Sequence, residues 1–316
     1  MSAVPPSSPI IVVGSANQDY IVRVSTPAGP GETVLAKSLL KQPGGKGANQ
    51  AVAAARLRAN VSFVACVGDD ADGTSLVREL RSEGVDTSNV EIINRGRTGL
   101  ALVSVYDSGE NSITVVPGTN FSLTAERVDD VVRRLAAGFA NSILVVQAEL
   151  VSNIIETALL AAEAMGARGI LNLAPYQPLP PHVLAVCDPL IVNETEASSL
   201  VGWAVHDLDS AARAVEQLQG VARSVVVTIG ARGAMWGDGQ TSGHTVAPLV
   251  ETVVDTTGAG DAFVGALAAT LSRGASLEDA VGVGVLAGSF AVKSPGAQSS
   301  YPMLTDLGTE LTGQLG

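Results

Sequence analysis

Short, continuously apolar runs rich in valine and isoleucine recur along this chain, with helix-like patterns between them. The runs are Ile10–Gly14, Val61–Val67, Ile143–Gln147, Gly169–Leu173, Leu190–Val192 and Val225–Ile229. A strand with one face in water alternates apolar and polar residues, whereas a strand buried on both faces does not. Intervening helices would bury both faces. We therefore predict an α/β fold, a doubly wound and mostly parallel sheet flanked by helices.

Two stretches break this rhythm. Residues 20–40 hold two short strand patterns around a Pro/Gly turn, and the patterns at 99–106 and 113–116 flank a turn signal at 107–111. We predict a β lid from 20–40 and 99–117, inserted into a core of 10–19, 41–98 and 118–316 after a flexible tail at 1–9. A thin sheet has a face to hide, which favours a lid that covers the active site and pairs two copies. A pair of surface hairpins is the alternative.

Charge and cysteine content limit the partners and the compartment. Acidic residues outnumber basic ones by 31 to 19, a net charge of −12, which repels nucleic acids and anionic lipids. Cys66 and Cys187, the only cysteines, are too few for a disulfide framework or a CxxC-type zinc site. The first residues lack the basic region of a signal peptide, and the longest uncharged segments are proline-interrupted or shorter than the ~20 residues of a membrane span. We expect a cytoplasmic protein.

The strongest local motif is Asp255-Thr256-Thr257-Gly258-Ala259-Gly260-Asp261, between a strand-like 251–254 and a small-residue helix at 259–273. Its glycines let the backbone approach a ligand closely. The N–H groups at a helix N-terminus favour an anion such as a phosphoryl group. Asp261 falls in the first turn beside this anion hole, where its carboxylate can act as a base. The alternative is an aspartate that only favours the helix dipole.

A second glycine-rich segment, Gly44-Gly45-Lys46-Gly47-Ala48-Asn49-Gln50, precedes an alanine-rich helix at 51–58. Its glycine pair permits close ligand approach, and Asn49 can both donate to and accept from a hydroxyl group. The segment is not a Walker A loop, because that pattern needs glycine at position 40 and Ser or Thr at position 47. A glycine turn packed on a helix, with Lys46 in solvent, is the alternative.

Polar residues follow several of the predicted strands, where open α/β sheets bind ligands. Asn193 and Glu196 come directly after 190–192, and an amide with a carboxylate suits hydrated Mg²⁺, although this spacing also forms a helix capping box. The segment Thr228–Gly233 is a strand end with a glycine turn. Other strand ends carry Asn17, Asp19 and Glu149. Each of these three is a candidate ligand contact or a solvated strand end.

Several chemistries lack their residues. The three histidines stand in no HExxH or nucleophile-elbow context, and Gly14-Ser15-Ala16-Asn17 does not supply the GxGxxG dinucleotide fingerprint. We therefore expect neither histidine-based hydrolysis nor dinucleotide chemistry.

The order and spacing of the motifs at 44–49, 193–196, 228–233 and 255–261 resembles the ribokinase branch of the PfkB carbohydrate kinase family, across essentially the whole chain after the tail. The segments Gly14–Asp19, Gly31–Val34 and Gly44–Ala55 are more similar to this branch than to adenosine or fructose kinases. The resemblance implies ATP-dependent phosphorylation of the 5-hydroxyl of D-ribose, with Mg²⁺, an activating K⁺ and a homodimer formed through the lid.

Positions that match the family's motifs receive its roles. Asp261 is similar to the catalytic base, with an anion hole formed by Gly258, Ala259 and Gly260. Ribose would be held, together with Asp261, by Asn17, Asp19, Gly45, Lys46, Asn49 and Glu149. The matching ATP positions are Asn193, Thr228, Gly230, Gly233 and Gly260, with Glu196 organising Mg²⁺ through water. The matching K⁺ positions are Asp255, Thr257, Ala291, Ser294, Gly296 and Ser300. Val285 stands where some members carry a histidine near the adenine.

Other functions would retain much of this pattern. A kinase of 2-deoxyribose, a nucleoside or a ketose keeps every phosphate motif and differs only around the sugar. A non-catalytic sugar- or nucleotide-binding regulator would share the fold, but it has no need of a base such as Asp261. Phosphoryl transfer needs positioning and charge neutralisation more than covalent help, so a metal, backbone donors and one base suffice.

Overall fold

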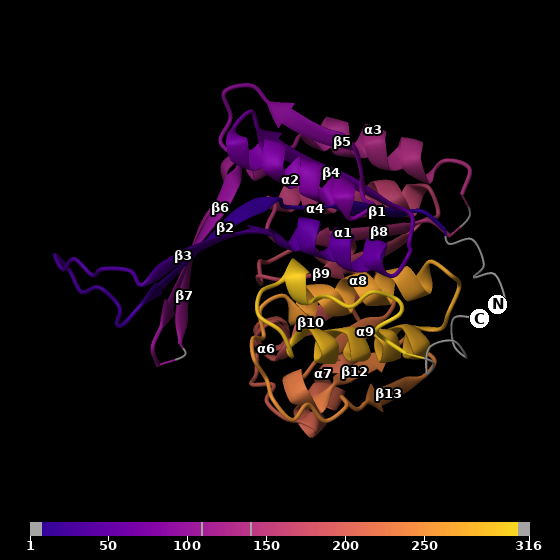
Figure 1. Ribbon diagram of the computed structural model, residues 1–316. Coiled ribbons are helices and arrows are strands. Elements are labelled where there is room, and N and C mark those ends of the chain that lie inside the picture. Colours follow the sequence, from indigo (N-terminus) through magenta and orange to yellow (C-terminus); the bar gives the residue numbers. More distant parts are fainter. Residues whose placement is uncertain (1–7, 109, 140, 309–316) are drawn as a thin grey trace.

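The computed structural model describes residues 8–108, 110–139 and 141–308 (Figure 1). Most of the predicted tail at 1–9 lies outside these residues. Of its last two residues, Ser8 donates its backbone N–H to the carbonyl of Ser272 at 2.8 Å, and the first strand begins at Ile10.

The core is one sheet of nine strands, which confirms the predicted fold class. The strands are β1 (Ile10–Val13), β4 (Val61–Gly68), β5 (Asp86–Ile93), β8 (Ile143–Gln147), β9 (Arg168–Asn172), β10 (Cys187–Asn193), β11 (Val225–Thr228), β12 (Ala234–Gly237) and β13 (Ser242–Thr245). Their order is β13-β12-β11-β10-β9-β8-β1-β4-β5. All neighbours from β5 to β11 are parallel, and only β12 and β13 pair antiparallel.

Helices cover both faces of this sheet. Their bounds are α1 (Lys46–Arg56), α2 (Ala71–Ser82), α3 (Ala125–Ala136), α4 (Ser152–Ala164), α5 (Pro181–Leu184), α6 (Glu194–Val201), α7 (Leu208–Leu218), α8 (Ala259–Leu271) and α9 (Leu277–Ala291). In β1, Ile10 and Val12 pack with α1, α2, α8 and α9, whereas Ile11 and Val13 pack with residues of α3 to α7. Both faces are buried, which explains why the run does not alternate.

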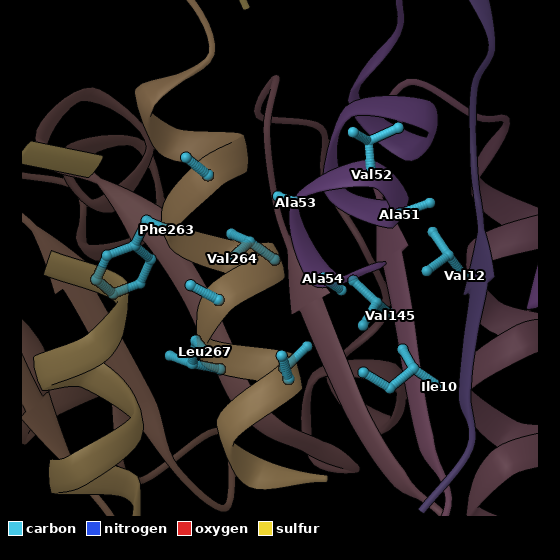
Figure 2. Packing of buried hydrophobic residues seen from close by; sticks show 14 of the residues in the cluster. Ile10, Val12, Ala51, Val52, Ala53, Ala54, Val145, Phe263, Val264 and Leu267 are labelled. Atoms are coloured by element: carbon cyan, nitrogen blue, oxygen red, sulfur yellow. The ribbon is translucent and has the colours of Figure 1, made fainter. Parts of the chain in front are cut away.

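Helices α1 and α8 lie in close contact because their facing residues are small. A Cβ placed on Gly265 of α8 would come within 2.5 Å of the Ala53 side chain and 2.7 Å of the Gln50 carbonyl oxygen of α1. Figure 2 shows Ala53 and Ala54 of α1 on the side of that helix that faces Val264 of α8. Such contact brings the N-terminal halves of the two helices, and the glycine motifs that open them, together.

Two local predictions are wrong. Helix α1 begins at Lys46, inside the glycine motif, and not at residue 51. No strand forms at 251–254; this segment is irregular, with Val253 and Val254 more than half exposed. Its end is held by Val254 and Asp255, whose N–H groups donate to the carbonyl of Val292 at 2.8 and 3.3 Å. A strand forms only where its backbone N–H and C=O groups pair with a neighbouring strand. The apolar residues of this segment do not by themselves supply such a neighbour.

Four further strands form a second sheet in the order β3-β2-β6-β7. They are β2 (Asn17–Val24), β3 (Ser38–Gly44), β6 (Gly99–Tyr106) and β7 (Asn111–Val116), so β2 and β3 extend beyond the 20–40 predicted for the lid. In Figure 1 this sheet projects away from the core on one side. No helix in the part of the chain that the structure describes is long and apolar enough to cross a membrane.

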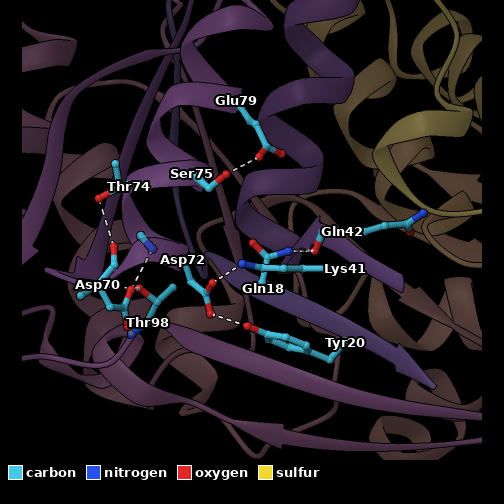
Figure 3. A network of polar contacts seen from close by, with 12 residues as sticks. Gln18, Tyr20, Lys41, Gln42, Asp70, Asp72, Thr74, Ser75, Glu79 and Thr98 are labelled. Atoms are coloured by element: carbon cyan, nitrogen blue, oxygen red, sulfur yellow. Dashed lines mark hydrogen bonds and ion pairs between the residues drawn. The ribbon is translucent and has the colours of Figure 1, made fainter. Parts of the chain in front are cut away.

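The base of the second sheet is fastened to the first turn of α2. Tyr20 of β2 donates its hydroxyl to Asp72 at 2.8 Å, and Lys41 of β3 forms an ion pair with the same carboxylate (Figure 3). Next to it, Asp70 caps α2 and accepts from the backbone N–H of Thr98 at 2.9 Å, just before β6 begins. Three strands are thus tied to one helix end.

Candidate active site

The parallel strands end in polar residues along one edge of the sheet. β8 ends at Gln147, β9 at Asn172, β10 at Asn193 and β11 at Thr228. Parallel strands bring their carboxyl ends to the same edge, where open α/β sheets bind ligands. Two adjoining cavities lie there, and both are lined by Thr228, Thr256, Gly260 and Phe263.

The first cavity, of about 240 Å³, is polar. Its lining brings together predicted site residues from distant parts of the chain, namely Lys46, Asn193, Glu196, Thr228, Gly258, Gly260 and Asp261. The second cavity, of about 420 Å³, is lined chiefly by apolar groups and glycines of the 228–233 turn, the 247–253 segment, α8 and α9. Gly230, Gly233 and Val285 are among them, so the Val285 position does border the cleft.

Backbone donors open the polar cavity at the start of α8. Gly258 caps the helix with φ +76°, which glycine adopts without strain. In the described part of the chain no oxygen accepts from the N–H groups of Gly258 and Gly260, whereas Ala259 donates to the Thr256 carbonyl at 3.3 Å. Two of the three predicted donors are therefore unpaired, which fits an anion.

The carboxylate of Asp261 lies beside these donors and is only 5% exposed. Asn49 donates to its Oδ2 and Gln50 to its Oδ1, each at 2.9 Å. Asn49 accepts in turn from Gln298 at 3.0 Å. Both carboxylate oxygens thus have buried amide partners.

Four carboxylates and one ammonium group, that of Lys46, influence one another in the next part of the site. Burial, and then the charges of Glu149 and Asp261, raise the pKa of Asp19 to about 7. The charge of Asp261 first, and those of Glu149 and Glu196 after it, raise the pKa of Lys46 despite its burial. The Oδ1 atom of Asp19 is buried without a hydrogen-bond partner. An unpaired acceptor in a buried site fits a ligand that donates hydroxyl groups.

Glu149 and Asn17 are held by neighbours. Glu149 accepts from the Ser15 hydroxyl at 2.5 Å and from the backbone N–H of Lys46 at 3.1 Å. The Asn17 side-chain oxygen accepts from Asn120 at 2.7 Å, so its amide nitrogen remains the group to donate elsewhere. Gly45, with φ +88°, lies so close to Ser15–Asn17 that a Cβ would come within 2.7 Å of the Asn17 nitrogen.

Asn193 and Glu196 form the capping box of α6, the alternative weighed from the sequence. Asn193 Oδ1 accepts from the Glu196 N–H at 2.9 Å, and Glu196 Oε2 accepts from the Asn193 N–H at 2.8 Å. Burial raises the pKa of Glu196, against the Asn193 N–H bond and the charge of Lys46. Because both residues also line the polar cavity, the capping box places a buried carboxylate at the wall of that cavity.

Two of the predicted potassium positions, Thr257 and Gly296, are hydrogen-bonded to a third, Asp255. Asp255 accepts from the N–H groups of Thr257 at 2.9 Å and Gly296 at 2.8 Å. These donors, helped by the Thr257 hydroxyl and Arg23, outweigh burial and lower the pKa of Asp255. At two further positions, Ser294 donates its N–H to the carbonyl of Ala291 at 3.3 Å. The hydroxyl of Ser300 donates to the Ala297 carbonyl at 2.7 Å.

Sequence reasoning missed the amides that support these groups. They are Gln50, Asn120, Gln147, Asn172 and Gln298, all buried. Gln147 and Asn172 could have been found, because each ends an apolar strand as Asn193 does. Gln50 and Gln298 carry no such signal.

A cleft that joins an apolar pocket to a polar one, with free backbone donors and a buried carboxylate, defines a phosphoryl-transfer site. Residues 8–304 match the pfkB family of carbohydrate kinases, and the chain belongs to that family. It is 36% identical to a ribokinase of Haemophilus influenzae over 93% of this chain and 95% of the relative. It is 34% identical to a deoxyribokinase of Salmonella typhi over 93% and 96%. The structure of an Arabidopsis thaliana ribokinase complexed with ribose and ATP is similar, with a TM-score of 0.87, 30% identity and 98% and 99% of the two chains covered.

Proposed function

We propose that this protein transfers the γ-phosphoryl group of ATP to the 5-hydroxyl of D-ribose, giving D-ribose 5-phosphate and ADP. The observation that carries the proposal is the place of Asp261. Its carboxylate lines the polar cavity beside the free N–H groups of Gly258 and Gly260, and it also lies close enough to Asp19 and Lys46 to shift their pKa values. The acceptor and the phosphoryl group therefore meet at one carboxylate.

The mechanism follows from this arrangement. Asp261 accepts the proton of the 5-hydroxyl while that oxygen forms a bond to the γ-phosphorus and the bond from phosphorus to the ADP oxygen breaks. The N–H groups of Gly258 and Gly260 donate to the oxygens on which negative charge grows. Lys46 adds a buried positive charge on the same cavity. The apolar cavity is large enough to hold a nucleotide base against Val285 and Phe263.

The sugar would lie among Asn17, Asp19, Lys46, Asn49 and Glu149. The unpaired Oδ1 of Asp19 supports an acceptor for a hydroxyl pair on the ring. Loss of the 2-hydroxyl would leave this acceptor unsatisfied, at a cost of about 1–3 kcal/mol. A kinase of 2-deoxyribose is the second candidate, since a deoxyribokinase is 34% identical to this chain.

Two cations complete the proposal. Glu196 and Asn193 suit Mg²⁺ held through water, since a buried carboxylate on a polar cavity is the oxygen ligand this ion prefers. Bound there, the ion would neutralise charge on the phosphates. Asp255, whose pKa is lowered, and the carbonyl-rich 291–300 segment suit K⁺, which would shape the anion hole without touching the substrate. Replacement of K⁺ by a bulky, inert ammonium ion should then lower turnover.

The test is ADP release with D-ribose, 2-deoxyribose, fructose and adenosine as acceptors, with Mg²⁺ and K⁺ present. We expect ribose to give the highest kcat/KM. Turnover dominated by another acceptor would retain the phosphate chemistry and reject the sugar assignment. No turnover on any of the four would favour a binding regulator.

We also propose that the second sheet pairs two copies of the chain. Leu39 and Leu40 point to opposite faces of β3, yet they are 65% and 51% exposed. β7 likewise exposes Ile113, Val115 and Val116. A thin sheet with apolar side chains exposed on both faces needs cover, and a second copy offers a matching surface. Ultracentrifugation should give a dimer, and Leu40→Glu should weaken it; a monomeric wild type at micromolar concentration would reject the proposal.

We place this activity in the cytoplasm. The two thiols, Cys66 and Cys187, are free and buried, and burial raises the pKa of each to about 12. Buried thiols of this kind form no disulfide, so the protein does not depend on an oxidising compartment. Fractionation of cells that express the full chain should recover the ribose-dependent activity with the cytosol.

A further inference from the structure

Gln50 is the one partner of the catalytic carboxylate that the proposed function leaves without a role. It follows Asn49 in the first half of α1, its side chain is fully buried, and its amide nitrogen donates to Asp261 Oδ1 at 2.9 Å. Asn49 holds the other oxygen, Oδ2, at the same distance. Consecutive residues of one helix therefore hold the carboxylate from both of its oxygens.

The orientation of the Gln50 amide is fixed by its other partners. Its nitrogen also donates to Asn172 Oδ1 at 2.9 Å, and its oxygen accepts from Gln147 at 2.8 Å. A carboxylate can only accept, so a reversed amide would set its oxygen against Asp261 and its nitrogen against the Gln147 amide nitrogen. The ends of β8 and β9 thus set the direction in which Gln50 donates.

Close packing of α1 on α8 keeps this donor in place. Gly265, one turn after Asp261 on α8, leaves no room for a Cβ beside the Gln50 carbonyl. Hydrogen bonds to a charged acceptor in a buried site are about twice as strong as those between neutral groups. In such a site the donor and the acceptor also have few alternative partners. The carboxylate is therefore restrained in rotation.

We infer that Gln50 is a positioning residue for phosphoryl transfer: it holds Asp261 in the orientation in which the carboxylate can accept the substrate proton. The inference rests on the proposed function, because it gives Asp261 the role of base. Gln50 itself lines neither cavity and its side chain is fully buried, so it would act through Asp261 and not on the substrate. A purely structural role, in which Gln50 only satisfies the strand-end amides, is the competing explanation.

The two explanations differ in their kinetics. A structural role affects folding, whereas a positioning role affects kcat and its pH dependence. Gln50→Met removes the donor with little change in volume, and Gln50→Glu places an acceptor there with almost the same shape. We expect kcat to fall by about 10–100-fold in both, as for a misplaced catalytic group. The KM for ribose and for ATP should stay close to the wild-type values, because binding contacts are intact.

The pH profile is the decisive measurement. Removal of a donor makes the charged carboxylate less favourable, so the acid limb of the kcat profile should move to higher pH in Gln50→Met. It should move further in Gln50→Glu, where a like charge faces Asp261. Asn89→Leu is the matched control, since Asn89 is a buried amide in β5, bonded to Arg134 and outside both cavities. It should lower the melting temperature without changing kcat or the profile.

The outcomes separate this inference from the function on which it rests. Folded Gln50 variants with near-wild-type kcat and an unmoved acid limb overturn the inference, as does a fall in kcat that Asn89→Leu reproduces. If wild type does not phosphorylate ribose, the proposed function fails. The ratio of variant to wild-type turnover, measured with the acceptor that is used or on slow ATP hydrolysis by water, then decides the role of Gln50.

Discussion

The two cavities of the cleft are built in different ways. The apolar one is formed by contiguous turns and two late helices, α8 and α9, with glycines and small side chains facing the space. The polar one and the carboxylates beside it draw residues from α1, β2, α6 and α8, far apart in the sequence, and depend on buried amides. In the proposed function, space alone serves the nucleotide base, whereas the reacting groups need a network that holds charge away from water. Substitutions in the two cavities, which form the two ends of the cleft, should therefore affect different kinetic constants.

The largest effect is expected at the reacting end, for Asp261→Asn. The amide keeps the size of the side chain but cannot accept the substrate proton, so kcat should fall by about 10²–10⁴-fold. The KM for ATP should change little, because the apolar cavity is untouched. Steady-state kinetics with varied ATP would measure both constants. Nearly unchanged turnover would remove Asp261 from the role of base.

Asp19 tests the cost of burying charge. Its folded-state pKa of about 7 lies above the ordinary aspartate value of 3.8, so the stability it contributes is full below the unfolded pKa and is lost as pH rises towards 7. Asp19→Asn removes this loss. The variant should be the more stable protein at pH 8, by up to about 4 kcal/mol, and the advantage should shrink towards pH 4.

Urea denaturation of both proteins across that range measures the difference. The same exchange at exposed Asp130 should give no such trend. A pH-independent difference would contradict the charged, buried state of Asp19. We expect the gain in stability to be accompanied by loss of kcat/KM for ribose, since the acceptor for its hydroxyl groups is gone.

A substitution in the apolar cavity should change the KM for ATP alone. Ser289 lines that cavity from α9, and Ser289→Phe would fill part of the space that the base needs. Overpacking of this kind costs about 1–3 kcal/mol, so the KM for ATP should rise by one to two orders of magnitude at similar kcat. Ser289→Ala, the matched control, leaves the space open and should behave as wild type. A fall in kcat at constant KM would mean that the two ends are not separable.

The difference between the two ends of the cleft also explains which residues could be predicted from the sequence. The phosphate motifs are contiguous, so Gly258 at a helix start and the Asn193–Glu196 pair at a strand end could be placed from local pattern alone. Most parallel strands were predicted to within a residue or two, because burial on both faces leaves an unbroken apolar run.

The amide network could not be predicted in this way. Gln50 and Gln298 are ordinary polar residues in sequence, and they acquire a role only when α1 and the 298–300 turn meet at Asp261. The strand predicted at 251–254 does not form for a related reason. Its apolar side chains face the cleft and the solvent, and whether a segment pairs as a strand depends on neighbours that no local pattern reveals.

The smallest expected effect lies where the two ends meet. Gly260 lines both cavities, and a Cβ there has no neighbour within 4 Å. Gly260→Ala should stabilise α8 by up to about 1 kcal/mol, because alanine is the better helix former, while its methyl group takes space from the phosphates and raises the KM for ATP. Gly258→Ala is the matched contrast: φ is +76° and the Cβ would come within 2.5 Å of the Tyr301 hydroxyl oxygen, so stability should fall. Thermal melts and ATP kinetics of both variants measure these effects. If Gly260→Ala melted higher and bound ATP as wild type does, the phosphates would have to lie farther from the start of α8 than the anion hole requires.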